Sequence, residues 1–294
     1  MSSLKKWFFG WRLVAFLALA AVVVWLALRG LPDGRLHVYF LDVGQGDAIL
    51  VQAPDGRQIL VVGGPSPTAL LNELGDVLPF WDRSLDLVVL THPDGDHITG
   101  LIPLLDRYRV GQVLDVRQSA TAPEAAPWLE GLAALSVPRI LAQRGMRLLV
   151  GDLGVTVLHP GFTQLTGTAS DDNNNAVVLR LDYGRTSLLL TGDAEAEAEA
   201  DMIAAGLPLH ADVLKIGHHG SNGASSLAFI AAVAPRLAVI PVGADNKFGH
   251  PHPAVLERLK GVEVLRTDQN GRIEVVSDGV VVKVRTERGR QVDK

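Results

Sequence analysis

Short apolar runs alternate with polar turn segments along most of the chain, from residue 36 to the C-terminus. The first three runs are separated only by the turn sequences "GQG" and "PDG", which predicts three consecutive strands joined by tight turns. In all, strands are predicted over "RLHVYFLDV", "DAILVQA", "RQILVVG", "LDLVVLT", "VGQVLDV", "GVTVLHP", "NAVVLRLDYG", "TSLLLTGD", "ADVLKIG", "RLAVIPVG", "GVEVL", "RIEVVSDG" and "VVVKVRT".

Helices are predicted in the segments between these strands. They cover "PTALLNELGDVL", "GLIPLLDRY", "PEAAPWLEGLAAL", "AEAEAEADMIAA", "SLAFIAAVA" and "HPAVLERLK". Strands with interspersed helices favour an α/β domain in which sheets pack on each other and helices lie outside. No long linker or short repeat interrupts residues 36–294, so this segment is predicted to be one domain.

One apolar run near the N-terminus is longer than any strand. Residues 13–28 contain sixteen apolar residues without a break, and extension back to Trp7 gives 22 residues. As a helix these would measure about 33 Å, enough for the ~30 Å hydrocarbon core of a bilayer. Residues 1–35 are therefore predicted to form a cytoplasmic stub and a single transmembrane anchor. A cleaved signal peptide and a buried core helix are the alternatives, but no small-x-small cleavage site follows the run.

Charges around this run predict its orientation. Lys5, Lys6 and Arg12 precede it, whereas Arg29, Asp33 and Arg35 follow it and nearly balance. The positive-inside rule then places the N-terminus in the cytoplasm and the domain outside, on the cell membrane.

Composition excludes several kinds of site. The chain has 294 residues, a formal net charge of −5 and no cysteine, which excludes disulfides, cysteine zinc sites and thiol nucleophiles. The acidic balance gives no global signature of nucleic-acid binding.

Metal-ligating side chains gather directly after a predicted buried strand, in "VVLTHPDGDHITG". Two histidines and two aspartates lie within six residues there: His92, Asp94, Asp96 and His97. Imidazole nitrogens and carboxylate oxygens are ligands for divalent metals, and strand ends are where α/β folds commonly place their chemistry.

Matching side chains follow three later strands. "LLLTGD" ends in Asp193, "VLKIGHHGS" contains His218 and His219, and "FGHPHP" contains His250 and His252. With His92 and His97 included, six of the nine histidines lie in three predicted strand-exit loops, which predicts that they meet at one site.

The motifs "HPDGDH", "LTGD" and "GHHGS" together resemble those of the metallo-β-lactamase-fold hydrolases. With "FLDVGQGDAILV", "NNAVVLRLDYG" and "FGHPHP", they resemble in particular the hydrolase domain of the ComEC competence proteins. The resemblance covers nearly everything from Leu36 onward. It implies an αββα sandwich with a metal site at one edge, here preceded by one transmembrane helix.

The resemblance also implies a ligand set for two divalent metal ions. His92 and Asp94 would bind one ion and Asp96 and His97 the other, while Asp193 would bridge them. His218 is favoured to complete one coordination shell, with His219 as the alternate. Carboxylate-rich ligation favours harder ions, so Mn²⁺ competes with Zn²⁺.

Two departures from the family pattern affect this site. Relatives usually carry a further histidine ligand before the bridging aspartate, but this chain reads "SDDNNNAVV" there, so Asn175 is expected nearby as a weak ligand. Relatives often carry an aspartate before the two glycines of "VVGGP", where this chain has Val62. That loss affects a hydrogen bond to a ligand rather than a ligand itself.

Paired metals activate water and neutralise anionic oxygens, which suits hydrolysis of phosphodiesters. Asp96 is expected to orient the nucleophile, and His250 to contact phosphate or protonate the leaving oxygen. His252 either joins His250 at the site or begins the helix "HPAVLERLK". The acids Glu195, Glu197, Glu199 and Asp201 are predicted to form a solvated helix face, and Lys215, Lys247 and Arg272 are candidate contacts to a nucleic acid.

Three functions are compatible with the sequence. The leading one is a membrane-anchored phosphodiesterase, in particular a nuclease on single-stranded DNA working with a DNA-uptake machinery. The second is a hydrolase of phosphorylcholine esters, lactones or amides. The third is a non-catalytic binding module. The missing histidine and Val62 favour this alternative, because both depart from the family pattern.

Overall fold

The computed structural model describes residues 14–21, 31–116, 123–289 and 291–293. The chain divides into two compact units, Met1–Asp33 and Gly34–Lys294. In the first unit, residues 14–21 are helical. None of the helices in the described ranges combines the length and apolar content that a membrane span needs. The span predicted over residues 7–28 lies mostly outside the described residues.

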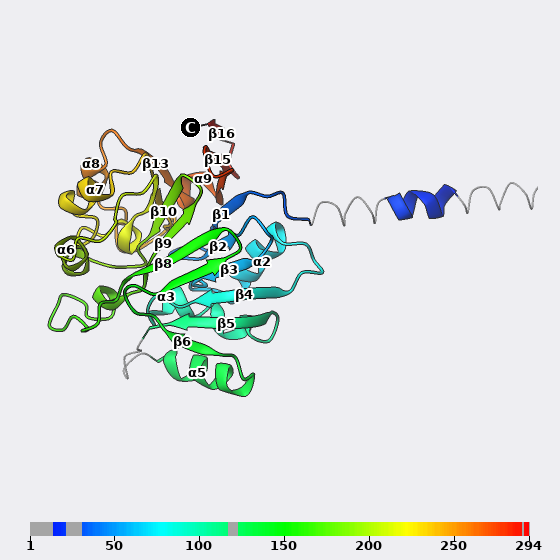
Figure 1. The fold of residues 1–294 in the computed structure, drawn as a ribbon, viewed down its shortest axis with the longest axis horizontal. Coiled ribbons are helices and arrows are strands. Elements are labelled where there is room, and N and C mark those ends of the chain that lie inside the picture. Colours follow the sequence, from blue (N-terminus) through cyan, green and yellow to red (C-terminus); the bar gives the residue numbers. More distant parts are fainter. Residues whose placement is uncertain (1–13, 22–30, 117–122, 290, 294) are drawn as a thin grey trace, which may run out of the picture. The chain divides into compact units, whose positions relative to one another are not determined.

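A mixed sheet of nine strands forms one half of the second unit (Figure 1). Its order is β16-β15-β14-β1-β2-β3-β4-β5-β6. Pairing is antiparallel from β16 to β3 and parallel from β3 to β6. The strands are β1 (Leu36–Phe40), β2 (Ile49–Gln52), β3 (Gln58–Val61), β4 (Ser84–Val89), β5 (Arg109–Asp115), β6 (Arg139–Leu141), β14 (Ile273–Ser277), β15 (Val282–Thr286) and β16 (Gln291–Asp293).

A second mixed sheet has seven strands in the order β13-β12-β11-β10-β9-β8-β7. Strands β10 to β13 run parallel, whereas β7 to β10 pair antiparallel, and the predicted hairpin at Tyr183-Gly184 joins β9 to β10. The strands are β7 (Arg147–Val150), β8 (Leu153–His159), β9 (Val178–Tyr183), β10 (Thr186–Leu190), β11 (Val213–Lys215), β12 (Leu237–Ile240) and β13 (Glu263–Arg266).

Helices connect the parallel strands, and side-chain caps fix where several of them begin. Ser66 accepts a hydrogen bond from the Ala69 amide and Ser226 from the Phe229 amide, which satisfies free N–H groups of α2 and α7. The helices are α2 (Pro67–Val77), α3 (Gly95–Ile98), α4 (Leu101–Leu104), α5 (Ala125–Ala134), α6 (Ala196–Ala204), α7 (Leu227–Val233), α8 (Pro253–Arg258) and α9 (Thr267–Asn270), with 3₁₀ turns η1 (Asn173–Asn175) and η2 (Gly217–Gly220).

The alternation of side chains along β10 explains the layering of the unit. Leu188 and Leu190 belong to the core between the two sheets, whereas Leu189 belongs to a second core under α6, α7 and α8. Successive strand residues point to opposite faces, so a strand that is apolar throughout must be covered on both sides. Figure 1 shows α6, α7 and α8 together on this sheet. The predicted α/β fold of packed sheets with helices outside is confirmed.

Strand direction determines where the candidate ligands gather. His92 follows the carboxyl end of β4, Asp193 that of β10 and His218 that of β11. Carboxyl ends of parallel strands share one edge of a sheet, and here the corresponding edges of both sheets meet.

Candidate metal centre

Four side chains from three loops converge at the carboxyl ends of the strands. Asp96, His97, Asp193 and His219 each offer a ligand atom, and these atoms all lie within 4.8 Å of one another. His219 Nε2 lies 3.2 Å from Asp96 Oδ2 and 3.3 Å from Asp193 Oδ2. His97 Nε2 lies 3.3 Å from Asp193 Oδ1. The cluster has the donor types and the spacing of a metal site.

His92 and Asp94 lie on another side of the same aspartate. His92 Nε2 is 3.7 Å from Asp94 Oδ2 and 4.0 Å from Asp193 Oδ2. The Thr91 hydroxyl lies 3.0 Å from His92 Nδ1 and holds the ring with Nε2 directed away from it. Asp193 therefore lies between two groups of donors, as a bridging carboxylate would.

The local backbone of the histidine pair is unusual. His218 has φ 45° and His219 has φ 51°, so two consecutive non-glycine residues adopt the left-handed conformation. Such conformations are costly and concentrate at functional sites. The turn directs both rings to Asp193, with His219 Nε2 at 3.3 Å and His218 Nε2 at 3.8 Å from Oδ2.

His218 and His219 contact different groups through their Nδ1 atoms. His219 belongs to the four-residue cluster, and its Nδ1 lies 3.0 Å from the Pro241 carbonyl oxygen. His218 Nδ1 lies 2.8 Å from Glu195 Oε1. The structure thus brings the alternate, His219, into the cluster with Asp96 and His97, and leaves the favoured His218 at its margin.

Unpartnered buried nitrogens show that these residues fit a metal. His92 Nε2, both ring nitrogens of His97 and His219 Nε2 are buried and have no hydrogen-bond partner among the described residues. A buried polar atom without a partner is costly, and such atoms are rare in folded proteins. Their convergence on Asp193 is accounted for if they are ligands.

The charges of the cluster stabilise one another. Although burial opposes it, His219, His97 and Lys215 hold the pKa of Asp193 well below its usual range. Burial also opposes the rise in the pKa of His219, which Asp193 and Asp47 nonetheless bring about. His92 behaves differently, because burial and the neighbouring His97 lower its pKa to about 3. It is therefore a neutral imidazole with a lone pair available to a cation.

Two site residues are absent from the sequence-based set: Asp47 and Lys215. Asp47 Oδ1 lies 3.3 Å from His219 Nδ1, and its other oxygen pairs with the Lys215 ammonium. Lys215 also donates to the Gly192 carbonyl oxygen at 2.6 Å and lies 3.4 Å from Asp193 Oδ1. Both side chains are almost fully buried. The prediction that Lys215 is a candidate nucleic-acid contact is therefore wrong.

The glycine-rich turn that carries Asp47 packs against the ligand loop. A Cβ on Gly46 would lie 2.3 Å from the Asp96 carbonyl oxygen, so only glycine allows this approach. The Asp47 amide donates to the same carbonyl oxygen at 3.3 Å. The sequence predicts a tight turn at "GQG" but does not indicate that this turn contacts the ligand loop.

The prediction that Asn175 lies beside the metal ligands is wrong, and Asn173 takes that place. Asn175 donates to the carbonyl oxygens of Leu165 and Asp171, so its amide fixes a loop rather than the site. Asn173 faces the site instead, with Nδ2 3.4 Å from His218 Nδ1 and Oδ1 buried without a partner in the described part of the chain.

The predicted solvated acidic face is wrong for two of its residues. Glu199 is buried and accepts hydrogen bonds from the Ser225 and Ser226 amides, which holds the loop after η2. Glu195 is buried and contacts His218. Glu197 is exposed and fits the prediction, whereas Asp201 is half-buried and pairs with Arg144.

Val62 is fully buried with φ 52°, an unusual conformation for a β-branched residue. Its amide donates to the Val89 carbonyl oxygen at 2.8 Å, at the end of β4. Because its side chain is apolar, it offers no hydrogen bond to the ligands, as the sequence indicates.

His250 and His252 lie in different local settings. The His250 ring centroid lies 5.6 Å from that of His218, and Asn246 holds the His250 backbone through two hydrogen bonds. His252 is the N-cap of α8 and accepts from the Ala254 amide. His250 therefore borders the cluster, whereas His252 begins a helix.

Comparison with known proteins agrees with this geometry. A model of the metallo-beta-lactamase superfamily matches residues 41–244. ComE operon protein 3 of Bacillus subtilis is 34% identical, over 81% of this chain and 32% of its own length. Competence protein ComA of Neisseria gonorrhoeae is 32% identical, over 90% and 36%. The chain spans about a third of the length of these relatives.

A solved structure shows the same fold. The metallo-beta-lactamase fold protein YhfI from Bacillus subtilis superposes with a TM-score of 0.56 at 16% identity, over 81% of this chain and 99% of that one. The matched span 41–244 includes the loops that carry His97, Asp193 and His219. The chain is related to competence proteins and belongs to the metallo-β-lactamase superfamily.

Proposed function

We propose that this chain is a metal-dependent hydrolase of phosphodiesters that acts on DNA while anchored in the cell membrane. The observation that carries the proposal is the convergence of unpartnered histidine nitrogens on Asp193 at one end of the sandwich. His97, Asp96 and His219 would hold one divalent ion and His92 and Asp94 another, with Asp193 between them. Bound ions would supply Lewis acidity and activate water for attack.

Asp96 and His250 would, respectively, orient the water and bind or protonate the substrate. Although burial opposes it, the neighbouring His97 and His219 hold the pKa of Asp96 well below its usual range, so Asp96 stays ionised. Its side chain is about one-third exposed, and it can orient an attacking water from the open side. His250, next to His218, would bind a phosphate oxygen or donate a proton to the leaving oxygen.

Exposed side chains beside His250 support a nucleic acid as substrate. Phe248 is 65% exposed and stacks on His250 with ring centroids 5.7 Å apart. Lys247 precedes it and is also exposed. An exposed aromatic face next to a cation is what single-stranded nucleic acids use for base stacking and phosphate contact. Relationship to competence proteins supports DNA uptake as the setting.

His250→Ala is expected to lower turnover of a DNA substrate by ~10²–10⁴, the usual loss for a general acid, while metal content stays unchanged. The measurement pairs elemental analysis of the purified chain with rates on DNA and on bis-nitrophenyl phosphate, in Mn²⁺ and in Zn²⁺. Asn222→Ala, a change in an exposed loop residue that contacts Arg258, is the control. Loss of metal from His250→Ala would make His250 a ligand and refute the division of roles.

Phe248→Ala is expected to raise KM for single-stranded DNA and leave KM for bis-nitrophenyl phosphate unchanged. Base stacking on an aromatic side chain contributes about 1–3 kcal/mol, so the increase should be at least ~5-fold. Phe162, which is 79% exposed in the loop after β8, provides the matched Phe162→Ala control. An equal change for both substrates would show that Phe248 supports His250 rather than a base.

One observation favours a second candidate, a binding module without catalysis. No histidine stands where relatives carry a ligand before the bridging aspartate, and Asn173 is the side chain found on that side. Absence of hydrolysis on DNA, bis-nitrophenyl phosphate and choline phosphodiesters, with metal bound, would favour this candidate.

A further inference from the structure

The end of the sandwich opposite the metal centre exposes large apolar side chains. Phe80 is 73% exposed and Trp81 49% exposed, and their rings pack edge to face 4.8 Å apart. Val280 is 61% exposed and Val281 37% exposed at the tip of the β14–β15 hairpin. Large exposed apolar side chains that share one end of a domain are candidates for an interaction surface.

Strand pairing shows that these two loops share one end of the molecule. Leu36, where β1 begins, pairs with Ser277, so the 278–281 hairpin lies at the amino end of β1. The intervening pairings make β4 run in the same direction as β1. The loop with Phe80 and Trp81 precedes β4, whereas the ligand His92 follows it. The apolar loops and the metal centre are therefore at opposite ends.

The chain enters the domain at this same apolar end. The Tyr183 hydroxyl donates to the Gly34 carbonyl oxygen at 2.9 Å. The β9–β10 hairpin in turn contacts the β14–β15 hairpin, since a Cβ on Gly184 would lie 2.4 Å from the Gly279 carbonyl oxygen. The entry point is thus fixed to the tips of both hairpins.

The length of chain before Gly34 limits its distance from the apolar run. That run ends at residue 28, six residues before Gly34. Even fully extended, six residues reach only about 20 Å. If the run spans a bilayer, Gly34 lies no more than about 20 Å from the hydrocarbon core. The lipid headgroups fill the first ~5–8 Å of that distance.

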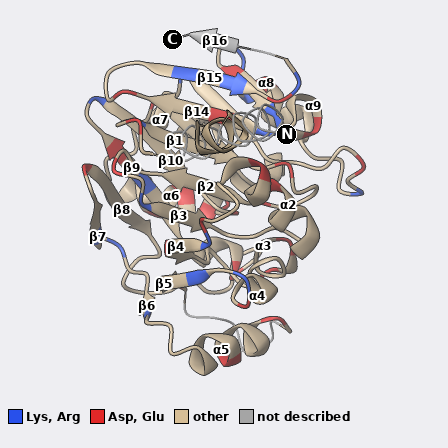
Figure 2. Cartoon of the chain, turned by 90° about the vertical axis from the view of Figure 1, so that its right-hand side faces the viewer, with Lys and Arg blue, Asp and Glu red and all other residues tan. Residues whose placement is uncertain are grey.

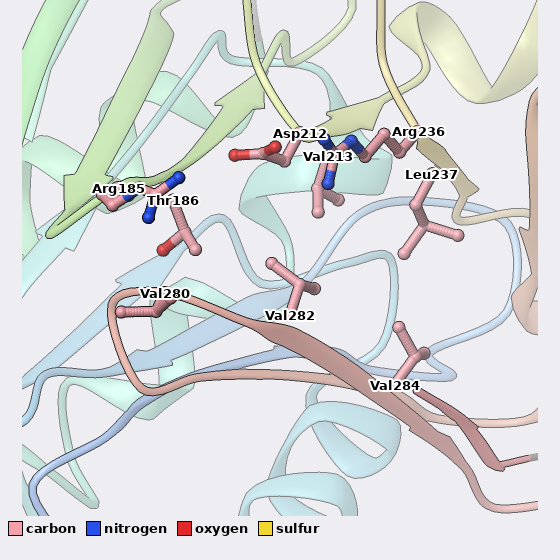
Figure 3. A pocket seen from close by; sticks show the side chains of 9 residues that line it. All are labelled: Arg185, Thr186, Asp212, Val213, Arg236, Leu237, Val280, Val282 and Val284. Carbon is pink, nitrogen blue, oxygen red and sulfur yellow. The ribbon is translucent and has the colours of Figure 1, made fainter. Parts of the chain in front are cut away.

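A small cationic pocket opens between the sheets at the same end (Figure 3). It measures about 110 Å³ and lies between Val280 and Val282 of the first sheet and Arg185 and Arg236 of the second. Within the described ranges, no hydrogen bond or ion pair involves either guanidinium. Asp212 also lines the pocket, but its carboxylate accepts from the Ser187 amide at 3.0 Å. Figure 2, which turns this side of the domain to the viewer, shows further basic residues on β15.

We propose that this end of the domain rests on the phospholipid surface into which the N-terminal run is anchored. Trp81, Phe80 and the two valines would enter the interfacial region, where aromatic side chains are favoured, and Arg185 and Arg236 would contact lipid phosphates. The metal centre then faces away from the bilayer, toward a polymer arriving from solution. This inference rests on the membrane anchor of the proposed function and goes beyond its chemistry.

The absence of cysteine allows a direct test on the full chain. Val280→Cys and Leu227→Cys, at sites 61% and 66% exposed, each receive a polarity-sensitive bimane label. Leu227 begins α7, which follows the carboxyl end of β11, so it serves as a control at the other end. The chains are reconstituted into phosphatidylcholine vesicles, with or without phosphatidylglycerol, that contain lipids spin-labelled near the headgroup.

Fluorescence of the Val280 label should be quenched and shifted to the blue, while the Leu227 label should remain unchanged. Arg185→Gln with Arg236→Gln should reduce the quenching in vesicles that contain phosphatidylglycerol. If the chains float with the vesicles but the Val280 label is not quenched, the surface proposal is refuted and the anchor stands. If the chains do not float with the vesicles, the anchor fails and the surface proposal fails with it.

Discussion

Asp193→Ala is expected to abolish both metal binding and hydrolysis. Its carboxylate lies within 3.3–4.0 Å of ring nitrogens of His92, His97, His218 and His219, which no other side chain of the cluster does. Loss of a residue that only supports a ligand lowers metal affinity by ~10–100-fold, so loss of a carboxylate shared by both groups of donors should exceed ~10²-fold. Metal content after dialysis and the rate on a phosphodiester measure the two effects.

Glu197→Ala is the matched control, because it removes a carboxylate close in sequence from an exposed position. Its oxygens contact only the Asn174 amide and the Ala169 backbone N–H among the described residues. It should keep its metal content and lose little activity. Equal, small effects of the two substitutions would refute the assignment of Asp193 as the bridging ligand.

Folding of Asp193→Ala is a necessary check on that interpretation. The substitution leaves the buried Lys215 with Asp47 as its remaining carboxylate partner, and the cores on both faces of the second sheet are intact. Circular dichroism should therefore show native secondary structure. A catalytic metal is not the main source of stability in a domain of this size.

The sequence predicts the fold well because strand burial here is regular. Runs such as "LLL" in β10 are apolar at every position, and the structure covers both faces of that strand. Ligand-bearing loops could be located for the same reason, since each follows the carboxyl end of such a strand. The positions of His92, Asp96, His97 and Asp193 after such strands, together with the family resemblance, predict that they form one site, and the structure brings them together.

The site residues that the sequence does not predict are those whose position depends on contacts between distant segments or on local backbone angles. In the sequence, Asp47 only follows a predicted turn, and Lys215 is only a candidate surface cation. The fold brings the two side chains together as a buried ion pair. The choice between His218 and His219 depends on two positive φ angles, which no residue type at these positions indicates. Asn173 faces the site and Asn175 does not, because a 3₁₀ turn rotates successive side chains to different sides.

The buried Lys215 is expected to couple the stability of the chain to metal binding. Although burial opposes it, Asp47 and Asp193 raise the pKa of Lys215, so the side chain is an ammonium ion held by two buried carboxylates. Together with His97 and His219 it supplies the positive charge around Asp193 in the absence of a metal. Divalent ions would supply additional positive charge at the same carboxylate.

Lys215→Met, which keeps the length of the side chain but removes the charge, is therefore expected to destabilise the metal-free chain by about 3–5 kcal/mol, the cost of leaving a buried ion without its partner. For a domain of this size that lowers Tm by on the order of 10 °C. Added Mn²⁺ or Zn²⁺ should raise Tm more in Lys215→Met than in the unsubstituted chain, because the ion then replaces positive charge that Lys215 supplied beside Asp47 and Asp193. Thermal denaturation with and without metal measures both quantities.

The double substitution Asp47→Asn with Lys215→Met separates charge from packing. It removes a carboxylate together with its ammonium partner, so it should be less destabilising than the sum of the single substitutions, with a coupling of about 0.5–3 kcal/mol. Asp47→Asn alone should also weaken metal binding by ~10–100-fold, because the negative charge of Asp47 lies 3.3 Å from Nδ1 of the candidate ligand His219. Additive effects on Tm, or a Lys215→Met chain whose Tm responds to metal no more than the unsubstituted chain, would show that Lys215 only fills space beneath Asp193.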